Sequence, residues 1–438
     1  MKWGSANDLG GLAAAAALSA GAVLGCVSSS GPRLPTTDPP VSAEAASIDL
    51  SSPQQTIEGF GASSAWTTPT MDDAHADQFF TTLGLGLTLL RVRITPDGTT
   101  DELATAQQAV ARGVAVWAAP WSPPAAWKSN GSLNQGGQLL PAYLGAWADR
   151  LASFVKTMAD AGVPLMALSA QNEPGFAADW ETCDWQPADL AAFVSGSLIP
   201  SLASAGLTVP VIAPETSDWN KFDRFASAIV ADPNAVGHVR ALATHSYGGA
   251  AHRLPSVDAS GVPVWETEYS DESAVTDPGM GSALKVATKI HVDLVTGNVA
   301  AWHYWWLNPR GPAGNGALTD GVNLTKRAYV LGNWSRFVRP GFVRVEATQS
   351  PTANVLVSAF TDPVTGRLVV VAVNASTADV TQAFAIAGGG AFASLTPWTT
   401  SEVLSLVAGA ALPVASDGTF AAVLPARSVT TLVADPAM

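Results

Sequence analysis

The sequence predicts an α/β fold, a (β/α)8 barrel with an attached all-β sandwich, because two regions of the chain have different patterns of apolar residues. Between about residues 59 and 340, short apolar runs alternate with segments of helical periodicity. That alternation is typical of parallel sheets whose strands are buried on both faces. After about Gly341 the helical periodicity ends, and short strand-like runs follow one another between Gly, Asp, Asn and Pro. The length of 438 residues leaves room for two domains.

Eight apolar runs are the candidate barrel strands, at residues 57–61, 87–94, 114–119, 164–170, 209–213, 241–245, 262–267 and 299–305. Helical segments separate them, for example 101–112 before Gly113 and 142–161 before Gly162, where a glycine can end the helix. Eight such units fit a barrel of about 250 residues. The alternative is an open doubly wound sheet, but no glycine-rich phosphate loop follows the first run.

The C-terminal runs predict a small antiparallel sandwich, with strands near residues 343–347, 355–360, 368–373, 382–386 and 429–433. Residues 47–50 alternate in the same way and could add a strand to it. We therefore expect the sandwich to comprise residues 45–58 and 341–438, and the barrel to comprise residues 59–340.

The composition excludes several classes of protein. Hydrophobic residues are 47% and charged residues 13%, a balance typical of a folded chain with a large core. The net charge of −14 repels phosphate backbones, so we expect no nucleic-acid partner. A neutral polymer is compatible with this surface, and we expect a monomer.

The N-terminus resembles the export signal of a bacterial lipoprotein. An apolar segment, 12–24, leads to Cys26 and is too short to be a usual membrane-spanning helix. We expect residues 1–26 to be a signal peptide and Cys26 to be lipidated. The protein would then be extracytoplasmic and would contact a membrane only through this lipid anchor. The alternative is an ordinary secretory signal. The composition of residues 27–44 predicts a flexible linker. We expect Cys183 to be a buried, inert thiol.

Two glutamates carry the functional prediction. An apolar run ends in Asn172-Glu173-Pro174, and Pro174 cannot continue a sheet ladder, so Glu173 lies at the carboxyl end of a buried strand. Glu268 ends a second such run, three strand–helix units later. Barrel enzymes have their catalytic groups at the carboxyl ends of the strands. A glycoside hydrolase needs at least two catalytic carboxyl groups, so this pair predicts glycoside hydrolysis.

Other interpretations of these residues stay open. Glu173 and Glu268 could instead be surface residues or ion-pair partners of Arg91 or Arg93. We interpret the nearby Glu266 and Glu215 as structural charge partners. His245 and Tyr247 follow the sixth run. They could orient Glu268 by hydrogen bonds, or they could be half-buried side chains whose hydrogen bonds are structural only.

Aromatic residues gather at the predicted strand ends: Trp66, Trp121, Trp127, Trp180, Trp185, Trp219, Trp305 and Trp306. Tryptophan faces pack on sugar rings, so sugar contact is favoured for Trp121 and Trp305. For the others, sugar contact and core packing stay open, whereas Trp147 lies on a helix core face. The six histidines are scattered, so we expect neither a metal nor a cofactor.

In combination, the motifs resemble glycoside hydrolase family 30. They are Ile57-Glu-Gly-Phe-Gly-Ala, Leu90-Arg-Val-Arg-Ile, Pro120-Trp-Ser-Pro-Pro-Ala, Ser169-Ala-Gln-Asn-Glu-Pro, Ile212-Ala-Pro-Glu, Thr244-His-Ser-Tyr-Gly, Val264-Trp-Glu-Thr-Glu-Tyr, Trp305-Trp and Lys326-Arg-Ala-Tyr. The resemblance implies a retaining double displacement, with Glu173 as acid/base and Glu268, not Glu266, as nucleophile. It implies that Asn172 binds the 2-hydroxyl of the sugar. The other substrate contacts that it implies are Arg91, Trp121, His245, Tyr247 and Trp305, and we also expect Trp66 to contact the substrate.

Within the family, the bacterial xylanase branch is the most similar. Members specific for glucuronoxylan carry an Arg-rich, Tyr-containing loop after the last strand. Here that loop has Arg310 but no following Tyr, so dependence on a glucuronate branch stays open. We expect an endo-acting hydrolase of plant-type polysaccharide, most similar to a xylanase. The alternatives are an endo-β-1,6-glucanase or galactanase, a glucosylceramidase-like β-glucosidase, or a non-catalytic glycan-binding lipoprotein.

Overall fold

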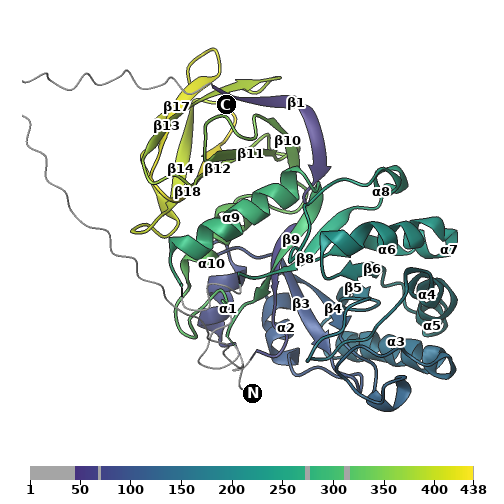
Figure 1. The fold of residues 1–438 in the computed structure, drawn as a ribbon. Helices are drawn as coiled ribbons and strands as arrows, with labels where there is room; N and C mark the ends of the chain where they lie inside the picture. Colours follow the sequence, from purple (N-terminus) through teal and green to yellow (C-terminus); the bar gives the residue numbers. More distant parts are fainter. Residues whose placement is uncertain (1–44, 68–70, 272–276, 310–315, 438) are drawn as a thin grey trace, which may run out of the picture. The chain divides into compact units, whose positions relative to one another are not determined.

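The computed structural model describes residues 45–67, 71–271, 277–309 and 316–437. This part contains a closed barrel of eight parallel strands and a β-sandwich (Figure 1), which confirms the predicted fold class. The predicted signal peptide 1–26 with Cys26, the linker 27–44 and Arg310 lie outside the described residues. None of the helices in the described ranges is long and apolar enough to cross a bilayer.

The barrel strands follow one another around the ring in sequence order. They are β2 (Gly59–Ser63), β3 (Leu89–Ile94), β4 (Ala115–Pro120), β5 (Leu165–Ser169), β6 (Val211–Thr216), β7 (Val239–Thr244), β8 (Val264–Tyr269) and β9 (Val299–Trp306). Parallel pairing of β9 with β2 closes the ring. Each predicted run overlaps one strand. The first starts two residues later than predicted, because Ile57 donates its N–H to Phe342 beside the sandwich.

The helices of the barrel part are α1 (Asp73–Phe80), α2 (Leu103–Val110), α3 (Leu144–Asp160), α4 (Pro187–Phe193), α5 (Ile199–Ser204), α6 (Trp219–Ala231), α7 (Pro233–Val236), α8 (Pro255–Ser260), α9 (Met280–Val295) and α10 (Lys326–Ser335). Helix α3 buries the predicted stripe that contains Trp147, Leu151 and Met158. Inside the barrel, Trp117 and Trp265 pack among alanines, so the interior is a filled core.

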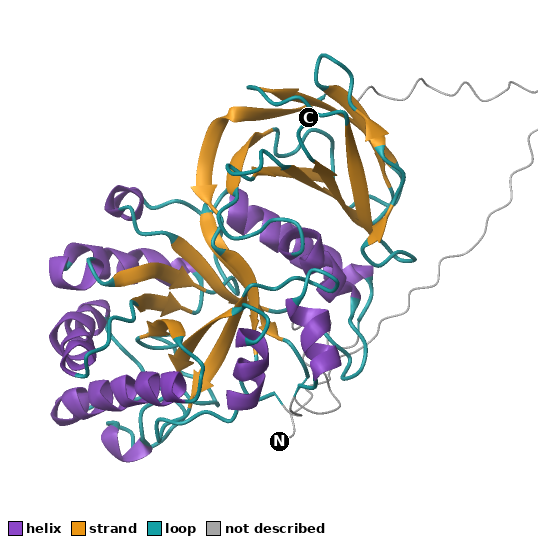
Figure 2. Ribbon diagram, turned by 180° about the vertical axis from the view of Figure 1, so that it is seen from behind, coloured by secondary structure: helices purple, strands orange, loops and turns teal. Residues whose placement is uncertain are grey.

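The sandwich consists of β1 (Ala46–Thr56), β10 (Val343–Ala347), β11 (Val355–Thr361), β12 (Leu368–Asn374), β13 (Val380–Ala387), β14 (Ser394–Thr400), β15 (Val407–Ala408), β16 (Leu412–Pro413), β17 (Thr419–Leu424) and β18 (Ser428–Ala434). Its strands form one hydrogen-bonded path, β15-β14-β18-β12-β11-β10-β1-β13-β17. Strands β12 and β17 lie far apart along this path yet contact each other, so the sheet folds into two layers (Figure 2).

The predicted extra strand near residues 47–50 exists as part of β1, which pairs with β10 and β13. The expectation of a purely antiparallel sandwich is wrong, because β1 and β13 pair in parallel, with Ala46 opposite Phe384. Strands β14, β15, β16 and β17 were not predicted. Pro397 lies within β14, and proline in a run argues against a strand even though β14 pairs with β15 and β18.

Two barrel helices pack against the sandwich. Helix α9 contacts β11, β12 and β18, and helix α10 contacts β14 and β18 (Figure 1). The buried amide of Asn333 on α10 donates to the carbonyl of Trp398 at 3.0 Å and to the hydroxyl of Thr431 at 2.9 Å. A polar side chain thus fixes this contact between two apolar surfaces.

Candidate active site

A cavity of about 550 Å³ opens at the carboxyl ends of the barrel strands. Loops after most of the strands contribute to its wall. The lining residues are Trp66, Trp121, Glu173, Phe176, Trp180, Ser217, Asp218, Asn220, Tyr247, Gly248, Glu268, Trp305 and Trp306. The predicted position of the site at this end of the barrel therefore coincides with a cavity that is large enough for sugar rings.

Glu173 and Glu268 face each other in this cavity. Glu173 follows β5, the fourth barrel strand, and Glu268 lies on β8, the seventh. They are only 4% and 6% exposed, and one carboxylate oxygen of each lies within 4.8 Å of the other. Retaining glycosidases hold their carboxyl groups about 5–5.5 Å apart and inverting ones about 6.5–9.5 Å, so this spacing fits retention.

The backbone at Glu173 is unusual. Its φ is +48°, in the left-handed region that favours glycine, while the N–H of Glu173 donates to the carbonyl of Glu215 on the next strand. Non-glycine residues in this region carry local strain and occur often at functional sites. The strand end is therefore bent at the residue whose carboxyl group enters the cavity.

Arg91 on β3 is fully buried and connects the carboxylates. Its Nη1 donates to Oε2 of Glu268 at 2.5 Å, and its Nη2 donates to Oδ1 of Asn172 at 2.5 Å. The same Nη2 lies 2.6 Å from Oε1 of Glu215. The guanidinium group also lies 4.4 Å from the ring centroid of Trp121. The ion pair between Glu268 and Arg91, one of the interpretations left open by the sequence, thus exists, and it holds Glu268 inside the cavity.

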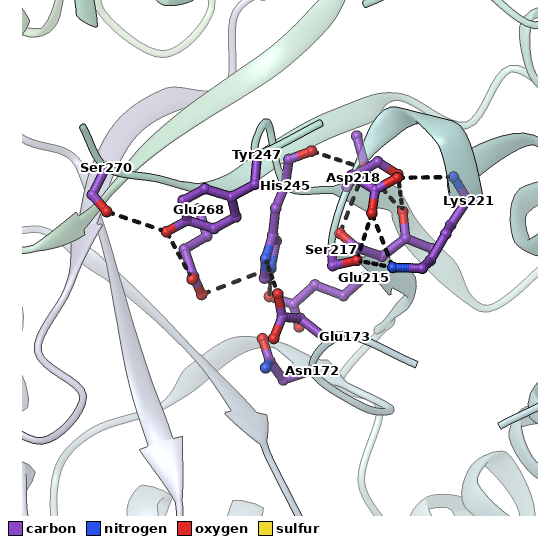
Figure 3. A network of polar contacts seen from close by, with 12 residues as sticks. Asn172, Glu173, Glu215, Ser217, Asp218, Lys221, His245, Tyr247, Glu268 and Ser270 are labelled. Atoms are coloured by element: carbon purple, nitrogen blue, oxygen red, sulfur yellow. Dashed lines mark hydrogen bonds and ion pairs between the residues drawn. The ribbon is translucent and has the colours of Figure 1, made fainter. Parts of the chain in front are cut away.

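The ring of His245 lies between three carboxylates (Figure 3). Its Nδ1 is 3.3 Å from Glu173, and its Nε2 is 3.5 Å from Glu215 and 3.8 Å from Glu268. Burial alone would lower the pKa of His245, but the negative charges of Glu268, Glu173 and Glu215 outweigh it and raise that pKa to about 10. His245 is therefore a protonated, positively charged residue at neutral pH.

Each oxygen of the Glu268 carboxylate has its own donor. Arg91 binds Oε2, and the hydroxyl of Tyr247 donates to Oε1 at 3.0 Å. Burial raises the pKa of Glu268, while the positive charges of His245 and Arg91 oppose that rise. The predicted orienting role of Tyr247 agrees with this geometry, in which two donors fix the plane of the carboxylate.

Glu215 and Glu266 are fully buried and do not line the cavity. Burial would raise the pKa of Glu215, but Arg91 and His245 outweigh it and lower that pKa below its ordinary value. Glu266 accepts the backbone N–H of Glu268 at 3.1 Å and of His303 at 3.0 Å. Burial, together with Asp293, raises the pKa of Glu266 well above its ordinary value. Of the carboxyl groups on β8, only Glu268 reaches the cavity.

Asn172 is 1% exposed, and its oxygen is bound to Arg91. Its Nδ2 has no hydrogen-bond partner among the described residues. A buried donor without a partner is costly, so an acceptor from a bound molecule would satisfy it. A sugar hydroxyl beside Glu173 could be that acceptor.

Four tryptophans form one wall of the cavity. Trp66 packs edge-to-face on Trp121 with centroids 5.0 Å apart, and Trp305 lies 6.0 Å from Trp66 and 5.8 Å from Trp121. Trp306 stacks on Trp305 at 5.1 Å. We call this set, Trp66, Trp121, Trp305 and Trp306, the tryptophan wall.

The remaining predicted tryptophans divide into two groups. Trp180 lines the cavity and is 46% exposed. Trp185 and Trp219 are buried in the core, and Trp127 stacks on Tyr143 at 5.3 Å. Cys183 is also buried, and burial raises the pKa of its thiol to about 12, which agrees with the prediction of an inert residue.

Sequence reasoning did not single out part of the cavity lining: Phe176, Ser217, Asp218, Asn220 and Gly248. All of them lie within eight residues of a barrel strand's carboxyl end. The segment Ser217-Asp-Trp-Asn directly follows β6, the fifth barrel strand, and its polar residues are the signal that could have indicated three of them.

The described residues also include a group that could hold a metal ion. Glu173, His245 and Glu268 each offer one ligand atom, all within 4.8 Å of one another. However, the guanidinium of Arg91 already binds Glu268, and His245 carries a proton at neutral pH. Two positive charges therefore occupy the place that a cation would need, and we interpret the cluster as acid–base machinery.

Family models match both parts of the chain. The "Glycosyl hydrolase family 30 TIM-barrel domain" matches residues 99–256, and the "Glycosyl hydrolase family 30 beta sandwich domain" matches residues 341–432. The glucuronoxylanase XynC of Bacillus subtilis is 32% identical over 90% of this chain and 92% of its own.

Solved structures agree with this assignment. The family 30 subfamily 8 xylanase Xyn30A of Clostridium acetobutylicum superposes with a TM-score of 0.80 at 34% identity, over 89% of this chain and 99% of its own. A family 30 endoxylanase of Clostridium papyrosolvens gives 0.77 at 34% identity, over 89% and 100%. With the barrel, the sandwich and the paired glutamates in place, this chain belongs to glycoside hydrolase family 30.

Proposed function

We propose that this glycoside hydrolase is a retaining endo-β-1,4-xylanase, with Glu268 as nucleophile and Glu173 as acid/base. The observation that carries the proposal is the Glu173–Glu268 pair, with oxygens within 4.8 Å of each other in an open cavity. The spacing leaves room for an anomeric carbon but not for an additional water, which an inverting enzyme needs.

The first step forms a covalent glycosyl-enzyme. An oxygen of Glu268 bonds to the anomeric carbon while the bond from that carbon to the leaving oxygen breaks, and Glu173 gives its proton to the leaving oxygen. Arg91 and Tyr247 hold Glu268 so that little motion is needed for attack. In the second step Glu173 removes a proton from water, whose oxygen replaces Glu268 on the sugar.

His245 and Asn172 would support this cycle without exchanging protons with the substrate. The positive charge of His245 lies beside both glutamates and partly compensates the negative charge that moves between them. The unpartnered Nδ2 of Asn172 is placed to donate to a sugar hydroxyl. Such a hydrogen bond contributes to catalysis if it strengthens in the transition state.

Xylan is the proposed substrate because three relatives that are 32–34% identical over about nine tenths of this chain are a glucuronoxylanase and two xylanases. The cavity lining continues on both sides of the glutamate pair, which favours endo cleavage over removal of terminal sugars. We also propose export and lipid anchoring at Cys26, which the apolar segment before it supports. Comparing initial rates on glucuronoxylan and on unbranched xylan tests whether a glucuronate branch, with Arg310 as its contact, is required.

The decisive experiment replaces each glutamate by glutamine and measures sugar release from glucuronoxylan, arabinoxylan, β-1,6-glucan and β-1,6-galactan. We expect Glu268→Gln and Glu173→Gln each to lose about 10³-fold activity or more. Glu173→Gln should still form the glycosyl-enzyme from an aryl glycoside, because a phenolate leaves without a proton. Near-wild-type turnover by either variant on the polysaccharide would contradict the roles.

Two further readouts separate the alternatives. Proton NMR of the first product should show the β-anomer, and an initial α-anomer would indicate inversion. Release of glucose alone, from glucosylceramide or an aryl glucoside, would favour the exo-acting alternative. Tight xylan binding by a wild-type protein that releases no sugar from any of these glycans would favour the non-catalytic binding protein.

A further inference from the structure

Tyr247 reaches Glu268 from a partly exposed position. The side chain is 37% exposed, and its hydroxyl donates to Oε1 of Glu268 and lies 3.4 Å from Oγ of Ser270 (Figure 3). The ring of Tyr247 lies 6.0 Å from the rings of His245 and Tyr269, measured between centroids. Packing covers only part of this ring. The position of its hydroxyl therefore depends on how firmly the backbone at residue 247 is held.

The backbone is anchored on both sides of Tyr247. The N–H of Ser246 donates to the carbonyl of Glu268 at 3.1 Å, and the carbonyl of Gly248 accepts the N–H of Trp219 at 2.9 Å. Trp219, at the start of α6, also donates its indole N–H to Oγ of Ser246 at 3.2 Å. One buried tryptophan thus binds the residue before Tyr247 and the residue after it.

Asp293, a buried residue of α9, lies behind this anchor. Ser246 donates its hydroxyl proton to Oδ2 of Asp293 at 2.8 Å, and Trp302 on β9 donates its indole N–H to the same oxygen at 3.0 Å. Ser246 is 2% exposed, and Asp293 and Trp302 are fully buried. Burial raises the pKa of Asp293 to about 6, so at neutral pH the residue is mainly a carboxylate and both hydrogen bonds are charge-assisted.

A carboxylate at this place is costly to the fold. The second oxygen of Asp293, Oδ1, is buried and has no hydrogen-bond partner among the described residues. The carboxylate loses its hydration on folding, and the two bonds at Oδ2 replace that hydration only in part. An apolar side chain could fill the same place without this cost. The hold that Asp293 has on Ser246, directly beside Tyr247, gives a reason for the carboxylate.

We propose that Asp293 is a positioning residue for catalysis, which acts through Ser246 to hold the hydroxyl of Tyr247 against Glu268. The proposal rests on the proposed role of Glu268 as nucleophile. Asp293 does not line the cavity, so it has no contact with a sugar bound there. A change at Asp293 would alter the orientation of Glu268 and leave the sugar contacts in place. We therefore expect an effect on kcat and not on KM.

The first measurement needs no substrate. Protein labelled with fluorotyrosine carries five labels, and Tyr247→Phe identifies the fluorine NMR signal of residue 247. We expect Ser246→Ala to shift or broaden this signal, because Tyr247 loses an anchor on one side. Ser282→Ala is the matched control and should leave the signal unchanged. The buried hydroxyl of Ser282 on α9 also binds a charged side chain, accepting from Arg327 at 3.0 Å. An unchanged signal in Ser246→Ala would overturn the proposal.

The second measurement is kinetic and uses the glycan that the wild type cleaves. Ser246→Ala and Asp293→Ala should each lower kcat about tenfold, with KM within about twofold of the wild type. Asp293→Asn keeps an acceptor oxygen for Ser246, so its kcat should stay within about threefold. In a Tyr247→Phe background, Ser246→Ala should lower kcat by less than about twofold, because both substitutions act through the same hydroxyl. Ser282→Ala should leave kcat unchanged.

Two kinetic results would overturn the role of Asp293. One is a loss from Ser246→Ala that is as large in the Tyr247→Phe background as in the wild type. The other is an equal loss of kcat in Ser282→Ala, which would show a general weakening of the fold. Near-wild-type turnover by Glu268→Gln would instead refute the nucleophile on which the proposal rests.

Discussion

The mouth of the barrel and the core of the sandwich bury opposite kinds of surface. At the mouth, Arg91, Glu215 and His245 are fully buried and contact one another through ion pairs. In the sandwich, the enclosed cluster is aliphatic and aromatic, with Leu395 and Leu432 fully buried. The barrel mouth thus buries charged side chains, whereas the sandwich core buries apolar ones.

The difference shows where stability and chemistry are located. Removing an ion from water costs several kcal/mol, and partners recover that cost only when the geometry is good. Apolar burial stabilises by about 25 cal/mol per Å² without such a requirement. We infer that the enclosed charges at the mouth lower the stability of the fold, whereas the apolar cores of the barrel and of the sandwich raise it.

The largest expected effect tests the enclosed charges. Arg91→Met should lower the free energy of unfolding by about 3–5 kcal/mol, because Glu215 and Glu268 lose the cation that compensates them. The same variant should lose most of its kcat, since Glu268 loses one of its two donors. Denaturant titration and initial rates on xylan measure the two effects separately.

Leu432→Ala is the matched variant in the sandwich. It removes a fully buried side chain and should cost about 2–5 kcal/mol, a similar loss of stability. Its kcat, measured on the folded fraction, should stay within twofold of the wild type. If Arg91→Met were as stable as the wild type, or if Leu432→Ala lost catalytic rate per folded molecule, the proposed division between the two regions would be wrong.

The fold was predictable because its signals are local. Each barrel strand is an apolar run bounded by turn residues, and this pattern survives without knowledge of the neighbours. Strand β14 was missed because Pro397 interrupts its pattern, and only its partners β15 and β18 reveal it. The parallel pairing of β1 with β13 joins residues more than 300 positions apart, which no local pattern encodes.

The site was predictable only where strand ends determine it. Glu173 and Glu268 follow apolar runs, so their positions on the fourth and seventh barrel strands could be inferred from the sequence. By contrast, Trp180, Trp185 and Trp219 all follow strand ends, yet only Trp180 reaches the cavity. The path of a loop decides whether its tryptophan enters the core or the cavity, and that path depends on the surrounding packing.

A pH titration of stability sharpens the comparison further. The pKa of His245 rises from 6.5 to about 10 on folding, so its stabilising contribution is complete below pH 6.5 and is lost as pH rises through about 10. Wild type should lose about 2–4 kcal/mol more than His245→Asn between these limits. Denaturant titrations of both proteins at several pH values measure this difference in the free energy of unfolding. Parallel pH profiles for the two proteins would contradict a protonated His245.

The smallest expected effect concerns how the tryptophan wall is held. Glu102, 3% exposed at the start of α2, accepts the backbone N–H of Arg93 at 2.7 Å and of Trp66 at 3.3 Å. Trp66 has a φ of +55°, and the guanidinium of Arg93 lies 4.8 Å from its ring centroid. One buried carboxylate therefore joins the ends of β2 and β3 and holds Trp66 in a strained backbone conformation.

Glu102→Gln keeps the shape of the side chain but replaces one acceptor oxygen by an NH₂ group, which faces a backbone donor. We expect Trp66 to become less ordered, so KM for xylan should rise about threefold, roughly 0.7 kcal/mol, while kcat changes little. Glu58→Gln is the matched control, because Glu58 is paired with Arg240 and Trp265 away from the cavity. The double variant with Trp66→Ala should show no further rise in KM beyond Trp66→Ala alone. Additive effects would mean that Glu102 acts through another residue.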